Sequence, residues 1–369
     1  MLDIVQNGKT GFIDATGKII IQPQFDDVSN FFEGRARFIE IDKKTWGLID
    51  GEGNIVVEPK FDEIKPFSEG RYAAARGGKW GYIDRDGELI IEPKFSKAEK
   101  FSEGRALVKE NDRYRFIDLN GNFITEEKFV NAESFSEGLA AVVIQEKNGS
   151  KQGFIDRNGD WAIELENDVH FDFVYNINSF KNGRALVFRY DLLSYSLLSP
   201  IEQIENRPDR KWGFIDRNGE TVIPFKYDVA LPFSDCLASV RPSDQNDDPS
   251  KIGLINIEGQ EVVEPVFDSI WYFSEGLATI EVNKKHGYID KKGQIVIEPK
   301  FDKAYSFSEG LAPVKIGDQW GYIDRSGQIV IEVQFDRAST FSRGVASVNI
   351  GDKRGYIDRK GEYIWLPTK

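Results

Sequence analysis

A string resembling Trp-Gly-Tyr-Ile-Asp recurs along the whole chain, and its spacing constrains the fold more than any other feature. The second position of this string falls at Gly11, Gly47, Gly81, Arg115, Gly153, Gly213, Gly253, Gly287, Gly321 and Gly355. The basic period is therefore 34 residues, with ten copies. Such a period indicates an array of one small unit rather than the two or three domains that 369 residues would otherwise suggest.

Each unit is expected to form three strands and a short additional segment. In the third copy, residues 71–76, 79–84 and 88–92 have strand composition, and Asp84 to Gly87 has the composition of a tight hairpin turn. A short fourth strand could lie around residues 98–101, and no helical periodicity is present. The expected fold class is all-β, built from three-to-four-stranded β-meander units.

Comparison of the copies indicates which positions are packed. The Ile before Asp is the same in all ten copies, and a second string, Phe-Ser-Glu-Gly, begins with Phe in all nine of its copies. We place that Phe at Phe32, Phe67, Phe101, Phe135, Phe180, Phe233, Phe273, Phe307 and Phe341. These positions should be buried, whereas the variable Trp position should be at least partly exposed. The Gly beside Ile should let a ring from the next unit, the Phe of the second string, approach the backbone.

The central strand of each unit is apolar on both faces, so neighbouring units must stack. Stacking could produce an open, superhelical β-solenoid or a closed, propeller-like ring. Both chain ends hold three complete strands, with Leu2 to Gln6 first and Tyr363 to Leu366 last, and neither end lends a strand to the other. We therefore favour the open array. Its ten units span approximately residues 1–34, 35–69, 70–103, 104–137, 138–182, 183–235, 236–275, 276–309, 310–343 and 344–369.

The two strings at fixed spacing resemble those of the WG repeat family of bacterial proteins, also called KWG repeats. The resemblance covers roughly residues 1 to 369, although only Trp46, Trp80, Trp212 and Trp320 keep the name-giving Trp. It implies a binding or interaction module whose partner the family does not define. If these four Trp side chains were exposed and aligned, they would favour binding of a glycan.

The period breaks in units five to seven, where the loop between the first two strands grows by 4, 19 and 6 residues. Loops at equivalent positions of adjacent repeats share one face, which is often the binding face. The longest insertion spans 190–211 and is apolar in its first half. Either it contacts a partner or it folds back and plugs its own array. The candidate partner-binding residues are Tyr190, Leu192, Leu193, Tyr195, Leu197, Leu198 and Trp212.

Composition narrows the function classes further. With 61 acidic and 48 basic residues, the chain carries a net charge of -13 and should repel nucleic acid. One cysteine and two histidines leave little for a disulfide, zinc, haem or iron–sulfur site. No apolar stretch approaches the length of a membrane span, and no leader is visible, so a cytoplasmic protein is expected unless a signal peptide was removed.

The Asp-x-Asp-Gly turn at Asp84 resembles part of a calcium loop. The equivalent turn at Asp290 carries lysines at the ligand positions, so a turn-capping Asp explains all copies better. We expect no cofactor, no metal and no catalytic residue. The sequence thus predicts a non-enzymatic scaffold for protein–protein interaction, with the enlarged loops of units five to seven as its binding face. The alternative is a carbohydrate or cell-envelope binding module that uses exposed Trp and Tyr.

Overall fold

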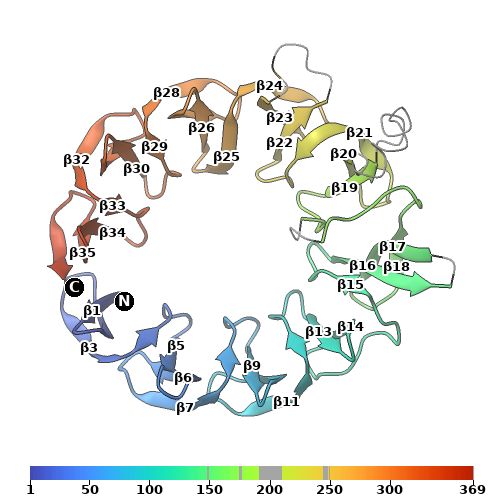
Figure 1. The fold of residues 1–369 in the computed structure, drawn as a ribbon, viewed down its shortest axis with the longest axis horizontal. Coiled ribbons are helices and arrows are strands. Elements are labelled where there is room, and N and C mark those ends of the chain that lie inside the picture. Colours follow the sequence, from blue (N-terminus) through green and yellow to red (C-terminus); the bar gives the residue numbers. More distant parts are fainter. Residues whose placement is uncertain (148, 174–176, 191–209, 244–247, 249, 369) are drawn as a thin grey trace, which may run out of the picture.

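The computed structural model describes residues 1–147, 149–173, 177–190, 210–243, 248 and 250–368. Every regular element within these residues is a β-strand, as the sequence predicts. The strands form nine antiparallel sheets that follow one another around a ring, as the blades of a β-propeller (Figure 1).

Each recurring unit contributes a first strand, a central strand that carries the Trp-Gly-Tyr-Ile-Asp string, and a third strand. The first strands are β1 (Leu2–Gln6), β5 (Arg35–Glu40), β9 (Tyr72–Arg76), β13 (Ala106–Glu110), β16 (Leu139–Glu146), β19 (Ala185–Tyr190), β22 (Leu237–Pro242), β26 (Leu277–Val282), β30 (Leu311–Ile316) and β34 (Val345–Ile350). The central strands are β2 (Lys9–Ile13), β6 (Thr45–Asp50), β10 (Lys79–Ile83), β14 (Arg113–Ile117), β17 (Gly149–Asp156), β20 (Arg210–Ile215), β23 (Ile252–Asn256), β27 (Lys285–Asp290), β31 (Gln319–Asp324) and β35 (Lys353–Asp358). The third strands are β3 (Ile19–Phe25), β7 (Ile55–Phe61), β11 (Leu89–Phe95), β18 (Trp161–Glu164), β21 (Thr221–Ala230), β24 (Glu261–Phe267), β28 (Ile295–Phe301), β32 (Ile329–Phe335) and β36 (Tyr363–Thr368).

A further set of inner strands follows most third strands but pairs with the first strand of the next sheet. These are β4 (Asp27–Val28), β8 (Glu63–Ile64), β12 (Lys97–Ala98), β15 (Asn131–Ala132), β25 (Ser269–Ser274), β29 (Lys303–Ala304) and β33 (Arg337–Ala338). The third strands lie on the outer rim of the ring, and the first strands lie toward its centre (Figure 1). The inner strands pair with the first strands on the side away from the central strand, so they lie nearest the ring axis.

The ring is closed, so our preference for an open array was wrong. The N- and C-terminal sheets lie side by side (Figure 1), and Ile4 and Ile13 share one apolar cluster with Val345 and Tyr356. No strand is exchanged between the ends, as the sequence indicates. The ring closes instead because the first and last sheets pack against each other. Packing of complete sheets does not change the number of strands at either end, so the strand pattern of the sequence does not reveal it.

The core lies between successive sheets, because each central strand is buried on both faces. Tyr82 and Ile83, adjacent on β10, are both 0% exposed. The ring of Phe101, which precedes the next first strand, packs 4.9 Å from Tyr82 at 64°. In the second unit the equivalent of Phe101 is Phe31, which lies 4.9 Å from Phe12, whereas Phe32 is 57% exposed. Our placement of the recurring Phe at Phe32 was therefore one residue late.

The recurring glycine serves a different contact from the one predicted. A Cβ built on Gly81 would lie 2.3 Å from the Ile91 carbonyl oxygen, on the third strand of its own sheet. The register between β10 and β11 shifts at this point, which brings that backbone across the glycine. In the fourth unit Arg115 replaces glycine, and its sheet, β12 to β14, contains no third strand among the described residues.

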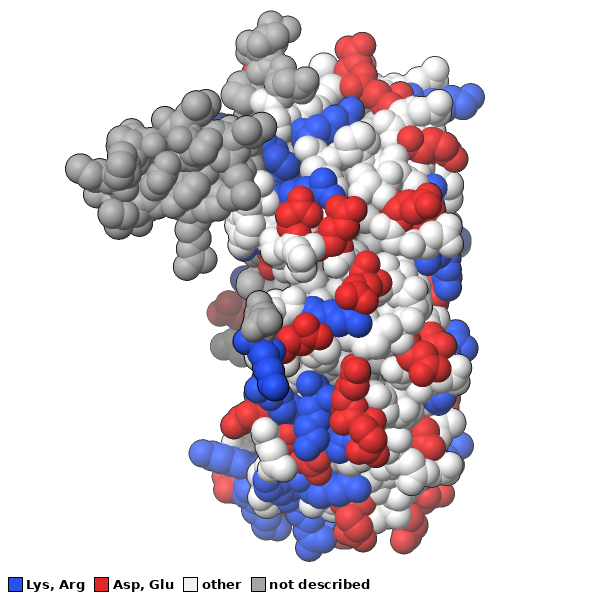
Figure 2. Space-filling model, turned by 90° about the vertical axis from the view of Figure 1, so that its right-hand side faces the viewer, with Lys and Arg blue, Asp and Glu red and all other residues white. Residues whose placement is uncertain are grey.

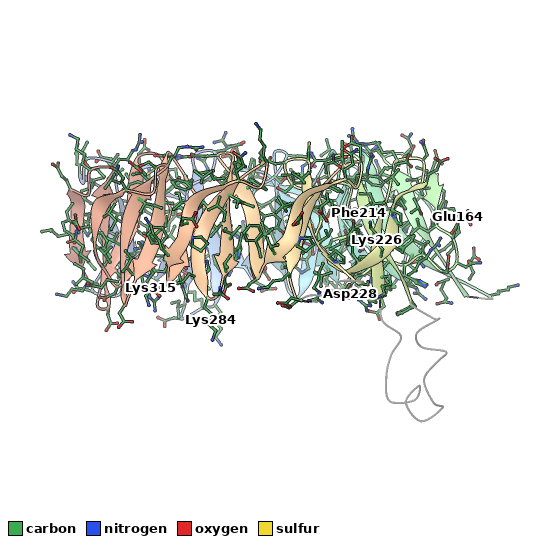
Figure 3. All side chains as sticks on the ribbon, turned by 90° about the horizontal axis from the view of Figure 1, so that it is seen from above. Glu164, Phe214, Lys226, Asp228, Lys284 and Lys315 are labelled. Atoms are coloured by element: carbon green, nitrogen blue, oxygen red, sulfur yellow. The ribbon has the colours of Figure 1, made fainter. Side chains whose placement is uncertain are left out.

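The turns on one face of the ring link neighbouring units. The Ser102 hydroxyl donates to the Phe135 carbonyl at 2.9 Å, and the Gly138 N–H donates to the Glu103 carboxylate at 2.8 Å. Within the hairpin turns, Asp84 Oδ1 accepts from the N–H groups of Asp86 and Glu88, both at 2.9 Å. The prediction that this Asp caps its own turn is confirmed. The hairpins between first and second strands lie on the opposite face, where Figure 3 shows Lys284 and Lys315.

Two units share a single six-stranded sheet, β19 to β24. The long strand β21 continues past its usual end and pairs with both β20 and β22, with Tyr227 opposite Trp212 on one side and Pro242 on the other. The period of the sequence breaks around these units, so the irregular spacing corresponds to an irregular join between sheets.

Candidate binding surface on the inner strands

The candidate residues from the longest insertion are only partly described. Leu192, Leu193, Tyr195, Leu197 and Leu198 lie outside the described residues. Tyr190 ends β19 and is 37% exposed, whereas Trp212 is only 9% exposed and packs 5.2 Å from the Phe188 ring. The structure brings both Tyr190 and Trp212 against the Phe188 ring, and Trp212 belongs to the core.

The name-giving tryptophans do not form an exposed, aligned row. Trp212 and Trp320 are buried, and Trp46 and Trp80 are half-buried. The Lys65 ammonium lies 5.0 Å from the centre of the Trp80 ring, and Tyr305 stacks on Trp320 at 4.8 Å and 17°. The prediction that this position is partly exposed holds for Trp46 and Trp80 and is wrong for Trp212 and Trp320.

A group of exposed, mostly aromatic side chains lies instead just before the recurring Phe, on inner segments of three adjacent units. Leu231 is 36% exposed, Trp271 42%, Tyr272 59% and Tyr305 49%. We call these four residues the inner aromatic patch. The same positions are polar elsewhere, for example Glu99 and Lys100, or Ser339 and Thr340. Sequence reasoning missed the patch because it compared recurring positions, although aromatic residues at an otherwise polar position were a visible signal.

The strand that carries most of the patch is longer than its equivalents. β25 has six residues, whereas the other inner strands have two. Its register with β26 shifts between Ile270 and Phe273, and a shift of this kind lets consecutive side chains avoid the core. Trp271 and Tyr272 occupy that shift and are both exposed. Together with Leu231 they line one shallow depression between the two sheets.

Two aromatic rings of the patch, those of Trp271 and Tyr305, each pack against the side chain at the Trp position of their own sheet. Trp271 lies 5.2 Å from the His286 imidazole, and Tyr305 rests on Trp320. Burial lowers the pKa of His286; the Glu281 carboxylate opposes this shift and the nearby Lys303 ammonium adds to it. The imidazole is therefore neutral around neutral pH and supports Trp271 as an uncharged ring.

Basic side chains flank the patch on the next two inner strands. Lys303 begins β29 and Arg337 begins β33, and both are exposed. Neither forms an ion pair with another described residue. Acidic and basic side chains are mixed on the side of the ring that Figure 2 shows, whereas these two cations have no carboxylate partner among the described residues.

The strands of the shared sheet line a partly open pocket of about 220 Å³. Its lining is Lys226, Tyr227, Val240, Pro242, Gly253, Leu254, Ile255, Gly259, Glu261, Val263 and Pro265. Lys226 and Glu261 are the charged residues of this lining, and Figure 3 labels Lys226 on β21. The lining offers no nucleophile with an adjacent base.

A buried polar cluster lies where the fifth unit is irregular. Glu133 is 2% exposed and accepts hydrogen bonds from the Asn178 amide at 2.7 Å and the Ser179 hydroxyl at 2.9 Å. Asn178 also accepts the Asp172 N–H at 2.9 Å, and Arg210 forms an ion pair with Asp172. Every member has a partner, so the cluster holds the irregular segment against the inner side of the fifth sheet.

Glu133 should make stability depend on pH. Burial raises its pKa, although hydrogen bonds from Ser179 and Asn178 oppose the shift. An acid whose folded pKa exceeds its unfolded value contributes stability below the unfolded pKa and loses it as pH rises through the folded pKa. Urea unfolding at several pH values should therefore show native protein losing stability relative to Glu133→Gln as pH rises above about 4. Parallel pH profiles for the two proteins would refute this.

Among the described residues, no group of three or more His, Cys, Asp or Glu side chains has the arrangement of a metal site. Cys236 is exposed and has a positive φ of 64°. No helix in the described part of the chain is long and apolar enough to cross a membrane.

The closed ring of small repeated sheets defines a repeat β-propeller. The model of the WG containing repeat matches residues 11–43, 46–80, 80–114, 114–147, 212–241, 252–285, 287–320 and 320–353. The chain therefore belongs to the WG repeat family, as the recurring strings indicate.

One solved structure with low sequence identity shows a likeness of fold. A crystal structure of the eukaryotic initiation factor shares 13% identity over 90% of this chain and 95% of that chain, with a TM-score of 0.54. A crystal structure of the tricorn protease shares 11% identity over 98% of this chain and 46% of that chain, with a TM-score of 0.33. No curated protein matches the chain.

Proposed function

We propose that this chain is a non-enzymatic scaffold that binds protein partners, and that the inner aromatic patch is a principal contact. One observation carries the proposal: four large apolar side chains, 36 to 59% exposed, lie on adjacent units at positions that are polar elsewhere in the ring. Monomeric soluble proteins rarely expose large contiguous apolar patches, and such patches mark interaction sites. Tyr and Trp are also the residues that most often dominate binding energy at interfaces.

The partner segment that fits this surface is apolar with acidic residues beside it. Tyr272 and Trp271 offer ring faces to aliphatic or aromatic side chains, and Lys303 and Arg337 are free to pair with carboxylates. The enlarged loops of units five to seven form a second part of the proposed contact region. They belong to the neighbouring part of the ring, so one partner could touch both.

Affinity capture with matched variants tests the proposal. The double variant Trp271→Ser, Tyr272→Ser removes the two central rings, and Glu99→Ser, Lys100→Ser makes the equivalent change where the inner segment is polar. For any partner that native protein enriches, we expect the first variant to recover about tenfold less of it. The second variant should recover as much of that partner as native protein does. A third chain without residues 191–209 measures the contribution of the longest loop. Equal prey recovery with all chains would overturn both contact assignments.

A glycan-binding module is the second candidate, because exposed aromatic faces also suit sugar rings. Tyr272, at 59% exposed, and Trp271 support this alternative, whereas the four name-giving tryptophans do not. A glycan array probed with native protein and with the double variant distinguishes the two candidates. Glycan binding that the double variant loses would favour the second candidate, and absence of binding to any glycan would reject it.

A further inference from the structure

The inner edge of the first strand is covered in nearly every unit. In the fourth unit, the Ser96 N–H donates to the Lys109 carbonyl and the Glu99 N–H donates to the Leu107 carbonyl, both at 2.8 Å. The same pair of bonds recurs in the third unit, where Asp62 and Lys65 donate to Ala75 and Ala73 at 2.8 Å. Seven inner strands provide this cover, β21 provides it for β22, and His170 provides it for β19.

Strand β1 differs, because no described residue pairs with its inner edge. Asp3 and Val5 correspond to Leu107 and Lys109, since Ile4 pairs with Gly11 as Val108 pairs with Arg115. The N–H and C=O of one strand residue point to the same side. The backbone groups of Asp3 and Val5 therefore face the ring centre, and Val5 is 37% exposed.

Side chains of the last sheet partly occupy this edge. The Asp3 carbonyl accepts from the Tyr356 hydroxyl at 2.7 Å and from Arg354 at 2.8 Å. In other units the equivalent Tyr hydroxyl donates to the inner segment itself, as Tyr82 does to the Glu99 carbonyl at 2.8 Å. At the seam, the Tyr356 hydroxyl instead donates to β1 itself, which is the first strand that an inner segment covers in the other units.

The segments that cover the other first strands define what this edge accepts. Each has a small or β-branched residue three positions before the recurring Phe, and this residue is at most 8% exposed. The pairs are Val28 and Phe31, Ile64 and Phe67, Ala98 and Phe101, Ala132 and Phe135, Ala230 and Phe233, Ile270 and Phe273, Ala304 and Phe307, and Ala338 and Phe341. The aliphatic residue packs between sheets, and the Phe ring covers the aromatic residue of the preceding central strand, as Phe341 covers Tyr322 at 4.9 Å.

We propose that the inner edge of β1 is a binding site for an extended peptide of a partner protein, with the pattern Ala, Val or Ile, then two residues, then Phe. The peptide adds as an antiparallel strand, and its N–H groups bond the carbonyls of Asp3 and Val5. Its aliphatic residue packs against the cluster that contains Ile4 and Tyr356. Its Phe displaces the Arg354 guanidinium, which lies 5.4 Å from the centre of the Tyr356 ring.

Peptide binding to the full chain tests this site independently of the inner aromatic patch. The probe is a fluorescently labelled peptide that copies residues 336–343, Asp-Arg-Ala-Ser-Thr-Phe-Ser-Arg. A control peptide has its Ala replaced by Asp and its Phe by Ser. We expect saturable fluorescence anisotropy with the first peptide at concentrations below about 1 mM, and at least about tenfold weaker binding of the control.

Two variants at one position show where the peptide binds. Val5→Pro removes the inward N–H without touching the bonds from β1 to β2, and proline is tolerated on an edge strand. Val5→Ala keeps that N–H. We expect Val5→Pro to weaken peptide binding at least about tenfold and Val5→Ala to change it less than about twofold, with circular dichroism confirming that both variants fold. The proposal is overturned by equal binding of the two peptides, by no binding, or by native affinity in folded Val5→Pro. If Val5→Pro does not fold, the comparison of the two peptides on native protein decides.

Discussion

Replacing Gly287 with alanine is expected to lower the free energy of unfolding by about 3 kcal/mol or more. The new Cβ would lie 2.4 Å from the Ile297 carbonyl oxygen and 2.7 Å from the Pro299 nitrogen. Both atoms belong to backbone, so relief requires β27 and β28 to separate and disturbs the register shift between them. Tyr288 and Ile289, both 0% exposed, would move with the strand and disturb the packing on either side. Thermal and urea unfolding followed by circular dichroism measure the effect.

Gly51→Ala is the matched control for this prediction. Its Cβ would meet only the flexible end of Met1 at 3.4 Å, and its φ lies outside the left-handed region. The same chemical change should therefore alter stability by less than about 1 kcal/mol, with slight stabilisation from the stiffer unfolded chain. If Gly287→Ala and Gly51→Ala lowered the free energy of unfolding equally, backbone crowding at the recurring glycine would not be the cause of the loss.

The strands were predictable because each depends on local sequence. Residues 71–76, 79–84 and 88–92 were expected as strands, and the structure has Tyr72–Arg76, Lys79–Ile83 and Leu89–Phe95. Alternation of side chains and a turn-forming Asp and Gly specify these elements within a few residues. Burial of both faces of the central strand also followed from composition, as Tyr82 and Ile83 confirm.

The recurring glycine shows where this local reasoning fails. Sequence comparison shows that a side chain is excluded at Gly81, but not which atoms exclude it, because the crossing of β11 depends on a register shift. The fourth unit supplies the reverse case. There the Arg115 guanidinium lies 3.4 Å from the centre of the Phe123 ring, and no regular third strand forms among the described residues.

The inner aromatic patch illustrates another limit of reasoning from repeats. Recurrence identifies positions that the fold requires, so it directs attention to the core and away from Trp271 and Tyr272. These residues differ from their equivalents because the fold does not constrain them. Their exposure, and their proximity to Leu231, depend on how one sheet meets the next. Ring closure also depends on how the sheets meet, because it is set by the sum of the angles between successive sheets. Local sequence does not specify these angles.

The seam between the first and last sheets should respond strongly to the loss of one carboxylate. The Asp3 side chain, 29% exposed, forms an ion pair with Arg354 and accepts the Tyr356 hydroxyl at 2.9 Å. Burial raises the pKa of the Tyr356 phenol, so its hydroxyl stays a donor at all ordinary pH values. Asp3→Ala leaves the Arg354 charge without its carboxylate, and we expect it to lower the free energy of unfolding by about 2 kcal/mol. Urea unfolding measures this loss.

The strands in which stability is lost show whether the Asp3–Arg354 pair fastens the seam or acts as an ordinary ion pair. The apolar cluster at the seam has four buried members, Ile4, Ile13, Val345 and Tyr356, whereas the cluster between the third and fourth units has nine. With less apolar packing to hold the ends together, Asp3→Ala should accelerate amide hydrogen exchange in β1 and β34 to β36 while β9 to β14 stay protected. Asp26→Ala, which removes the ion pair with Lys9 and the acceptor of the Ile41 N–H, lies away from Arg354 and is the control; it should leave the seam amides unchanged. Uniform acceleration around the ring after Asp3→Ala would mean that closure is distributed over all sheets and that Asp3 and Arg354 do not fasten it.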